Sequence, residues 1–165
     1  MILLKKALLY DISNMAYMIA DTGEPLNHSL HKVRDICQDS NIDRVARVLG
    51  LAYSNIIEAL RPIINSSGIN PDKDLSSRPR NYSIPLRCDH ELRHILTPGQ
   101  KLRIKEHCHV YMVSLALQDW LEMTLPQAAD VWKDRAEGAL EALQAIASSI
   151  ISSLTGGLRR RVSPF

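Results

Sequence analysis

The spacing of apolar residues along the chain predicts helices in most of its length. In residues 2–20 apolar side chains recur every three to four positions, as in a helix with one buried face. A shorter pattern of the same period predicts a helix over about 27–38. The clearest stripe spans residues 41–60 and stops before Pro62; its members are Ile42, Val45, Ala46, Leu49, Ala52, Tyr53, Ile56 and Leu60.

Start signals predict two longer helices in the C-terminal half. Thr97-Pro98-Gly99-Gln100 has the residues of a capping box with proline at the first helical position, and it should open a helix to about Met123. Pro126 should start the last and longest helix, ending near Leu154. Because glycine interrupts helices, Thr155-Gly156-Gly157 predicts that residues 155–165 form an extended C-terminal arm.

Residues 65–87 show no period and predict a long mid-chain loop. The segment is rich in Ser, Pro, Asn and charge, with one short extended piece expected at Tyr82–Leu86. Loops of this length are uncommon inside a compact domain and are often functional. The predicted fold is therefore an all-α bundle of about four to five helices over residues 1–154, including the loop, followed by the arm at 155–165.

Composition supports this fold and limits the class of protein. Aromatic residues make up only 5% of the 165 residues, so the core must be aliphatic, which suits packed helices. A formal net charge of +2 is far from that of a nucleic-acid coat. The three widely spaced cysteines, Cys37, Cys88 and Cys108, indicate reduced thiols. No uninterrupted apolar stretch is long enough to span a bilayer, so we expect a soluble intracellular protein and no membrane partner.

One short run matches a zinc motif. His90-Glu91-Leu92-Arg93-His94 has the H-E-x-x-H spacing with which helical metalloproteases bind zinc, and Cys108 is a candidate further ligand. The context is poor, since Arg93 puts a cation inside the motif and only a short segment remains before Thr97. The sequence favours a histidine-containing linker with no cofactor and no catalytic residue; a zinc hydrolase using His90, Glu91 and His94 stays as an alternative.

A second alternative is a small helical DNA-binding or regulatory protein. Arg44 and Arg47 lie on the polar side of the helix predicted for residues 41–60 and would meet phosphates. Recognition helices usually carry several base-reading polar residues on the outer face. That face is sparse here, so a core helix is the favoured interpretation.

The C-terminal end has three consecutive arginines at 159–161 followed by the apolar residues Val162 and Phe165. This pattern predicts that the segment docks on a neighbouring protein. Arginines would pair with carboxylates and Phe165 would fill a pocket. Together with the mid-chain loop, this gives a predicted partner interface of Arg159, Arg160, Arg161, Val162, Phe165, Arg78, Arg80 and Tyr82.

Two segments carry a resemblance to a known family. LLYDISNMAYMIAD (8–21) and NIDRVARVLGLAYSNIIEALRP (41–62) together resemble small helical head-to-tail connector (ring or adaptor) proteins of crAss-like and related Bacteroidales phages. LPQAADVWKDRAEGALEALQAI (125–146) is similar to the long last helix of such connectors. Residues 65–110 match nothing in that family, which has no catalytic residues to transfer.

The resemblance implies a non-enzymatic virion structural protein. Its partners would be copies of itself in a ring, usually twelvefold, together with the portal protein and neighbouring tail or ring proteins. Non-specific contact with packaged DNA is expected along the channel. The chain would be made in the host cytoplasm and would lie at the head–tail junction of the virion.

Overall fold

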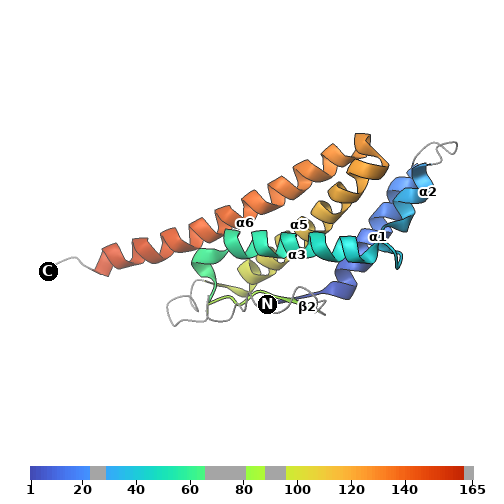
Figure 1. The fold of residues 1–165 in the computed structure, drawn as a ribbon. Helices are drawn as coiled ribbons and strands as arrows, with labels where there is room; N and C mark the ends of the chain where they lie inside the picture. The colour runs from blue at the N-terminus through green and yellow to red at the C-terminus, as the bar shows by residue number, and fades with distance from the viewer. Residues whose placement is uncertain (23–28, 66–80, 88–95, 162–165) are drawn as a thin grey trace.

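The fold of the chain is a helical bundle with one small sheet (Figure 1). The computed structural model describes residues 1–22, 29–65, 81–87 and 96–161. Within these ranges there are five α-helices and two strands, which confirms the predicted all-α class. In chain order the elements are β1 (Ile2–Leu4), α1 (Lys5–Thr22), α2 (Ser29–Arg34), the 3-10 turn η1 (Asp35–Cys37), α3 (Ile42–Ala59), the 3-10 turn η2 (Arg61–Ile63), β2 (Asn81–Ser83), α5 (Pro98–Thr124) and α6 (Pro126–Arg161).

Helix α5 is the centre of the bundle. It forms an antiparallel hairpin with α6 across Leu125 and also contacts α1, α2 and α3. The main contacts of α1 are with α2, η1, β1 and α5, whereas those of α6 are with α5, α3 and η2. Figure 1 shows α5 between α1 and α6, so these two helices cover different sides of the central helix.

The core is aliphatic, as the composition predicts. Its largest fully buried side chains are Leu3, Leu8, Ile12, Ile36, Leu49, Ile56, Leu60, Ile63, Ile84, Ile104 and Met112. The stripe predicted for residues 41–60 is confirmed, because Val45, Leu49, Ala52, Ile56 and Leu60 are all buried. Ser114 is the one buried polar residue among those described. The fold is therefore stabilised mainly by the burial of apolar area, at about 25 cal/mol per Å². Few buried polar side chains among the described residues need a hydrogen-bond partner.

The first residues of the chain form a strand, so the helix predicted from residue 2 is wrong over its first turn. Leu3 on β1 pairs with Tyr82 on β2 in antiparallel register, and both side chains are buried. The ladder extends to Met1, whose ammonium donates to the carbonyl of Ile84 at 2.9 Å and whose carbonyl accepts from the Ile84 N–H at 2.8 Å. A partner 83 positions away leaves no local sequence signal.

The predicted mid-chain loop is closed at its base by backbone pairing. The N–H of Asn65 donates to Pro85 O at 2.8 Å, and the N–H of Arg87 donates to Ile63 O at 2.9 Å. The expected extended piece at Tyr82–Leu86 is confirmed in part, as β2 and as an isolated bridge between Ile64 and Leu86. Residues 66–80 lie outside the described ranges.

The long hairpin confirms one predicted helix boundary and corrects another. At the start of α5, the N–H of Gln100 donates to Thr97 Oγ1 at 3.3 Å and the N–H of Thr97 donates to Gln100 Oε1 at 2.9 Å, which completes the capping box. Helix α6 does not end near Leu154; it continues through Gly156-Gly157 to Arg161, so no extended arm begins at residue 155.

Two physical effects explain the longer helix. Once a helix is formed, each added residue gains one hydrogen bond, which offsets the roughly 1 kcal/mol that a glycine costs relative to alanine. The sequence also places three arginines, at 159–161, in the last turn of α6, and positive charge near a helix C-terminus is favoured by the helix dipole. Residues 162–165 lie outside the described ranges. No helix in the described parts of the chain is both long and apolar enough to cross a membrane.

Candidate interaction surfaces

The candidate metal ligands are not assembled in the described structure. Cys108 is fully buried on α5, and burial raises the pKa of its thiol to about 12, which keeps the sulfur protonated. His90 and His94 lie outside the described residues. Among the residues that are described, no three His, Cys, Asp or Glu side chains come together in a way that would hold a metal ion.

The histidines near Cys108 have separate surroundings. His109 Nε2 lies 2.7 Å from Asp11 Oδ2, which joins α5 to α1. His107 faces the opposite way and lines a hollow between α5 and α6. Since each residue of a helix is turned by about 100° from the one before, two residues two positions apart point about 200° apart, and these side chains lie at different interfaces. The geometry at His109 is that of a structural contact between two helices.

Arg44, a candidate phosphate contact, is engaged within the fold. Its guanidinium donates to both carboxylate oxygens of Asp119, with Nε–Oδ2 at 2.7 Å and Nη2–Oδ1 at 3.1 Å. The hydrogen bond to Asp119 raises the pKa of Arg44 and keeps it charged. The pair joins the start of α3 to the end of α5. Arg47, the second candidate, is exposed one turn further along.

The predicted partner interface is only partly described, and one member is corrected. Tyr82 is 2% exposed and its ring packs against that of Tyr53 at a centroid distance of 5.4 Å, so Tyr82 belongs to the core. Burial raises its pKa to about 12. The arginines 159–161 form the last turn of α6. The remaining members, Arg78, Arg80, Val162 and Phe165, lie outside the described residues.

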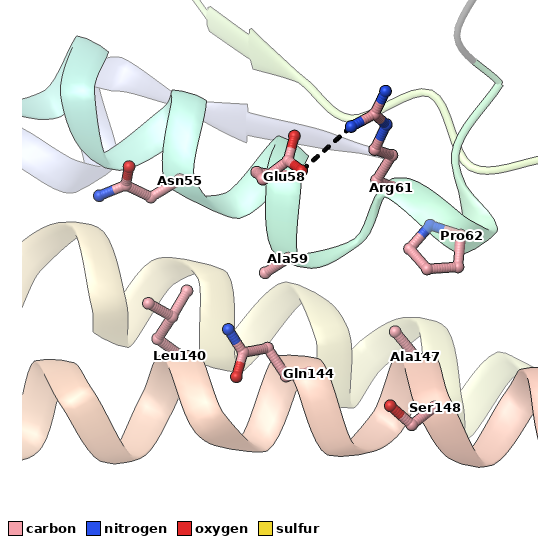
Figure 2. A pocket seen from close by; sticks show the side chains of 9 residues that line it. All are labelled: Asn55, Glu58, Ala59, Arg61, Pro62, Leu140, Gln144, Ala147 and Ser148. Carbon is pink, nitrogen blue, oxygen red and sulfur yellow. Dashed lines mark hydrogen bonds and ion pairs between the residues drawn. The ribbon is translucent and has the colours of Figure 1, made fainter.

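An open groove lies between the end of α3 and the middle of α6 (Figure 2). Its volume is about 870 Å³ and it is broadly open to solvent. We call it the α3–α6 groove; it is lined by Asn55, Glu58, Ala59, Arg61, Pro62, Leu140, Gln144, Ala147 and Ser148. Glu58 and Arg61 form an exposed ion pair of 3.2 Å at its rim.

The groove has an apolar floor and polar edges. Ala59 and Pro62 from one side face Leu140 and Ala147 from the other, so small side chains leave the space open (Figure 2). The sequence prediction missed this surface. The sequence does contain a run of small residues that begins at Ala147. This run indicates a groove only once α3 is known to lie beside α6.

A second, smaller hollow lies on the other flank of α6. It has a volume of about 340 Å³ and is lined by Gln100, Arg103, His107, Ala142, Ala145, Ile146 and Ser149. The middle of α6, residues 140–149, therefore borders an open hollow on each of two flanks.

The outer side of α1 exposes large side chains. Tyr10, Tyr17 and Met18 are 70%, 52% and 57% exposed, and we call them the α1 face. The guanidinium of Arg34 lies 4.8 Å above the Tyr17 ring and also pairs with Asp21. Grouped exposed aromatic side chains on a helix are typical of protein–protein contacts.

Comparison of the chain with protein-family models, curated protein sequences and solved structures finds no match. The described surfaces are two open hollows and one aromatic helix face.

Proposed function

We propose that this chain is a non-enzymatic structural subunit of a virion, which assembles into a ring that joins the portal to tail components around the DNA channel. The observation that carries the proposal is the presence of two unlike surfaces on different sides of α5. The α1 face projects large side chains, whereas the α3–α6 groove is hollow. Closed rings are built from heterologous contacts, which need two different surfaces on every subunit.

The shape of the hairpin also supports a connector. At 1.5 Å per residue, the 36 residues of α6 are about 54 Å long, and Figure 1 shows the last turns extending past the other described elements. Three arginines end this helix. In a ring they would face a neighbouring component or the phosphates of packaged DNA, to which they would bind without reading sequence.

The test is the mass and composition of the assembly. We expect the purified chain to form a closed ring, twelvefold as the family resemblance implies, in native mass spectrometry and negative-stain electron microscopy. We also expect the chain in purified virions, in stoichiometry with the portal. A chain that stays monomeric at all concentrations and is absent from virions contradicts the proposal.

One observation favours a second candidate, a DNA-binding regulator. Lys101, Arg103 and Lys105 are all exposed on the first turns of α5. Gel-shift experiments over a range of salt concentrations separate the two functions. A stable free dimer that retards DNA of defined sequence would support the regulator and contradict the ring.

A further inference from the structure

We propose that the α1 face of one copy docks into the α3–α6 groove of the next copy. This inference rests on the proposed assembly and deepens it by naming the two contact surfaces. The occupant of the groove is then a second copy of this chain, in a contact that repeats from subunit to subunit.

The α1 face has the properties of a binding anchor. Tyr10 and Tyr17 are seven residues apart, so they lie on the same side of α1 about 10 Å from each other. Tyrosine offers a large contact area with few rotatable bonds, and its immobilisation on binding therefore costs little entropy. The Arg34 guanidinium over the Tyr17 ring further restrains that side chain before any partner arrives.

The α3–α6 groove has complementary properties. Its floor of small and aliphatic side chains, Ala59, Leu140 and Ala147, leaves room for protruding rings. Gln144 and Ser148 on its α6 side carry polar groups within reach of a tyrosine hydroxyl seated there (Figure 2). Anchors that fill a neighbour's pocket contribute most of the binding energy at such contacts.

Charge complementarity commits the groove to a second copy. On α1, Lys6 precedes Tyr10 by four residues, and Tyr17 follows seven later. On α6 the same spacing recurs in three exposed residues: Glu137 precedes Glu141 by four residues, and Ser148 follows seven later. If α1 lies parallel to α6 of the next copy in this register, Lys6 faces the Glu137 carboxylate and Tyr17 faces Ser148 in the groove. Tyr10 then lies beside Glu141, next to the groove residue Leu140. Opposite charges at the end of the contact fix its register.

The position of the two surfaces makes the contact propagate. Because α1 and α6 have their main contacts on different sides of α5, one copy cannot fill its own groove with its own α1 face. Each subunit therefore inserts its α1 face into one neighbour and receives the α1 face of the other neighbour in its α3–α6 groove. Such a heterologous contact closes into a ring when its rotation divides the circle.

The main comparison uses four forms of the chain, measured by sedimentation velocity and native mass spectrometry: the wild type, a face variant, a groove variant and a control. The face variant is Tyr10→Ser with Tyr17→Ser, and the groove variant is Ser148→Trp, which places a bulky ring at an exposed lining position. The control is Val131→Ser, since Val131 is 68% exposed on α6 but belongs to neither surface. Circular dichroism of each variant checks that the fold is retained.

We expect the wild type and the control to assemble, and the face and groove variants to remain monomeric alone. An equimolar mixture of those two variants should give a one-to-one dimer, because each supplies the surface that the other lacks. Lys6→Glu should weaken assembly about two- to fivefold, the range of an exposed ion pair, and Glu137→Lys in the same chain should restore it.

The outcomes separate this inference from the assembly itself. If all four forms assemble equally, the named surfaces are wrong and the ring stands. If the mixed variants form no dimer, the contact is not heterologous and the inference is overturned. A wild type that never associates overturns both.

Discussion

His109 on α5 and Asp11 on α1 meet through Nε2 and Oδ2 at a distance of 2.7 Å. The side chains are 30% and 41% exposed, so the contact is partly shielded from water. The residues are 98 positions apart, and the contact therefore forms only when α1 packs on the central helix. It reports the docking of the helix that carries the α1 face.

A double-mutant cycle with Asp11→Ala and His109→Ala should give a coupling energy of about 1 kcal/mol, the value typical of a partly buried hydrogen bond. Urea unfolding measures it. The control is the exposed pair Glu58–Arg61, whose side chains are 72% and 76% exposed and whose coupling should stay below about 0.5 kcal/mol. Equal coupling in the two cycles would show that the His109 contact stabilises helix docking no more than an exposed surface pair does.

Replacing Trp120 by phenylalanine should lower the free energy of unfolding by about 2 kcal/mol. The indole N–H donates to Val33 O at 3.1 Å in a buried site that joins α5 to α2, and phenylalanine leaves that carbonyl unpaired beside a small cavity. Unfolding is followed by far-ultraviolet circular dichroism.

The matched control is Trp132→Phe. Trp132 is only partly buried on α6, with the Arg135 guanidinium 5.3 Å above its ring, so its replacement should cost less than about 1 kcal/mol. A larger effect at Trp132 than at Trp120 would contradict the role assigned to the buried hydrogen bond.

The stability of the protein should fall at alkaline pH. Burial raises the pKa of the Cys108 thiol from 9.0 to about 12 and that of the Tyr82 hydroxyl from 10.0 to about 12. The unfolded chain therefore releases these protons first. Their neutral forms favour the fold fully below about pH 9, and this contribution is lost as the pH rises towards 12, by at most about 1.4 kcal/mol per pH unit and group.

The variant Cys108→Ala should lose less stability than the wild type between about pH 9 and 10. In this range the Cys108 thiol of the unfolded chain titrates before the Tyr82 hydroxyl, because its unshifted pKa is 9.0 rather than 10.0. Unfolding by urea at several pH values measures the slope. The exposed-site variant Val131→Ser should keep the wild-type slope. An unchanged slope in Cys108→Ala would mean that the thiol is not shielded in the folded protein.

Gly138→Ala should raise the free energy of unfolding by about 0.5–1 kcal/mol. Gly138 is exposed in the middle of α6, and an added Cβ would meet no atom within 4 Å. Gly99→Ala is the control, since that site is equally open but lies in the first turn of α5, where alanine gains less. Thermal or urea unfolding decides, and a destabilised Gly138→Ala would indicate that this exposed side of α6 is occupied.

Local patterns in the sequence determined the class of fold and several helix boundaries. The capping box at Thr97 and Gln100 fixes the start of α5, because its hydrogen bonds join residues only three positions apart. Pro126 likewise starts α6. The stripe on α3 correctly identified its buried side, since a period of three to four residues reports which side of a helix avoids water.

Other features depend on contacts between distant parts of the chain. Strand β1 exists because Leu3 pairs with Tyr82, and the same pairing takes Tyr82 out of the predicted interface into the core. Arg44 is removed from the candidate phosphate contacts by Asp119, which lies 75 positions away. A polar residue at the surface of an isolated helix cannot reveal the partner that a neighbouring helix brings to it.

The candidate interaction surfaces divide in the same way. The sequence by itself determined the class of fold, a bundle of helices with an aliphatic core. Only the tertiary structure decided that α3 lies beside α6 with Ala59 and Ala147 too small to close the space between them, and that Tyr10 and Tyr17 face outward. Periodicity identifies the side of each helix that is buried, but packing decides what covers it, and so which surfaces remain open to a partner.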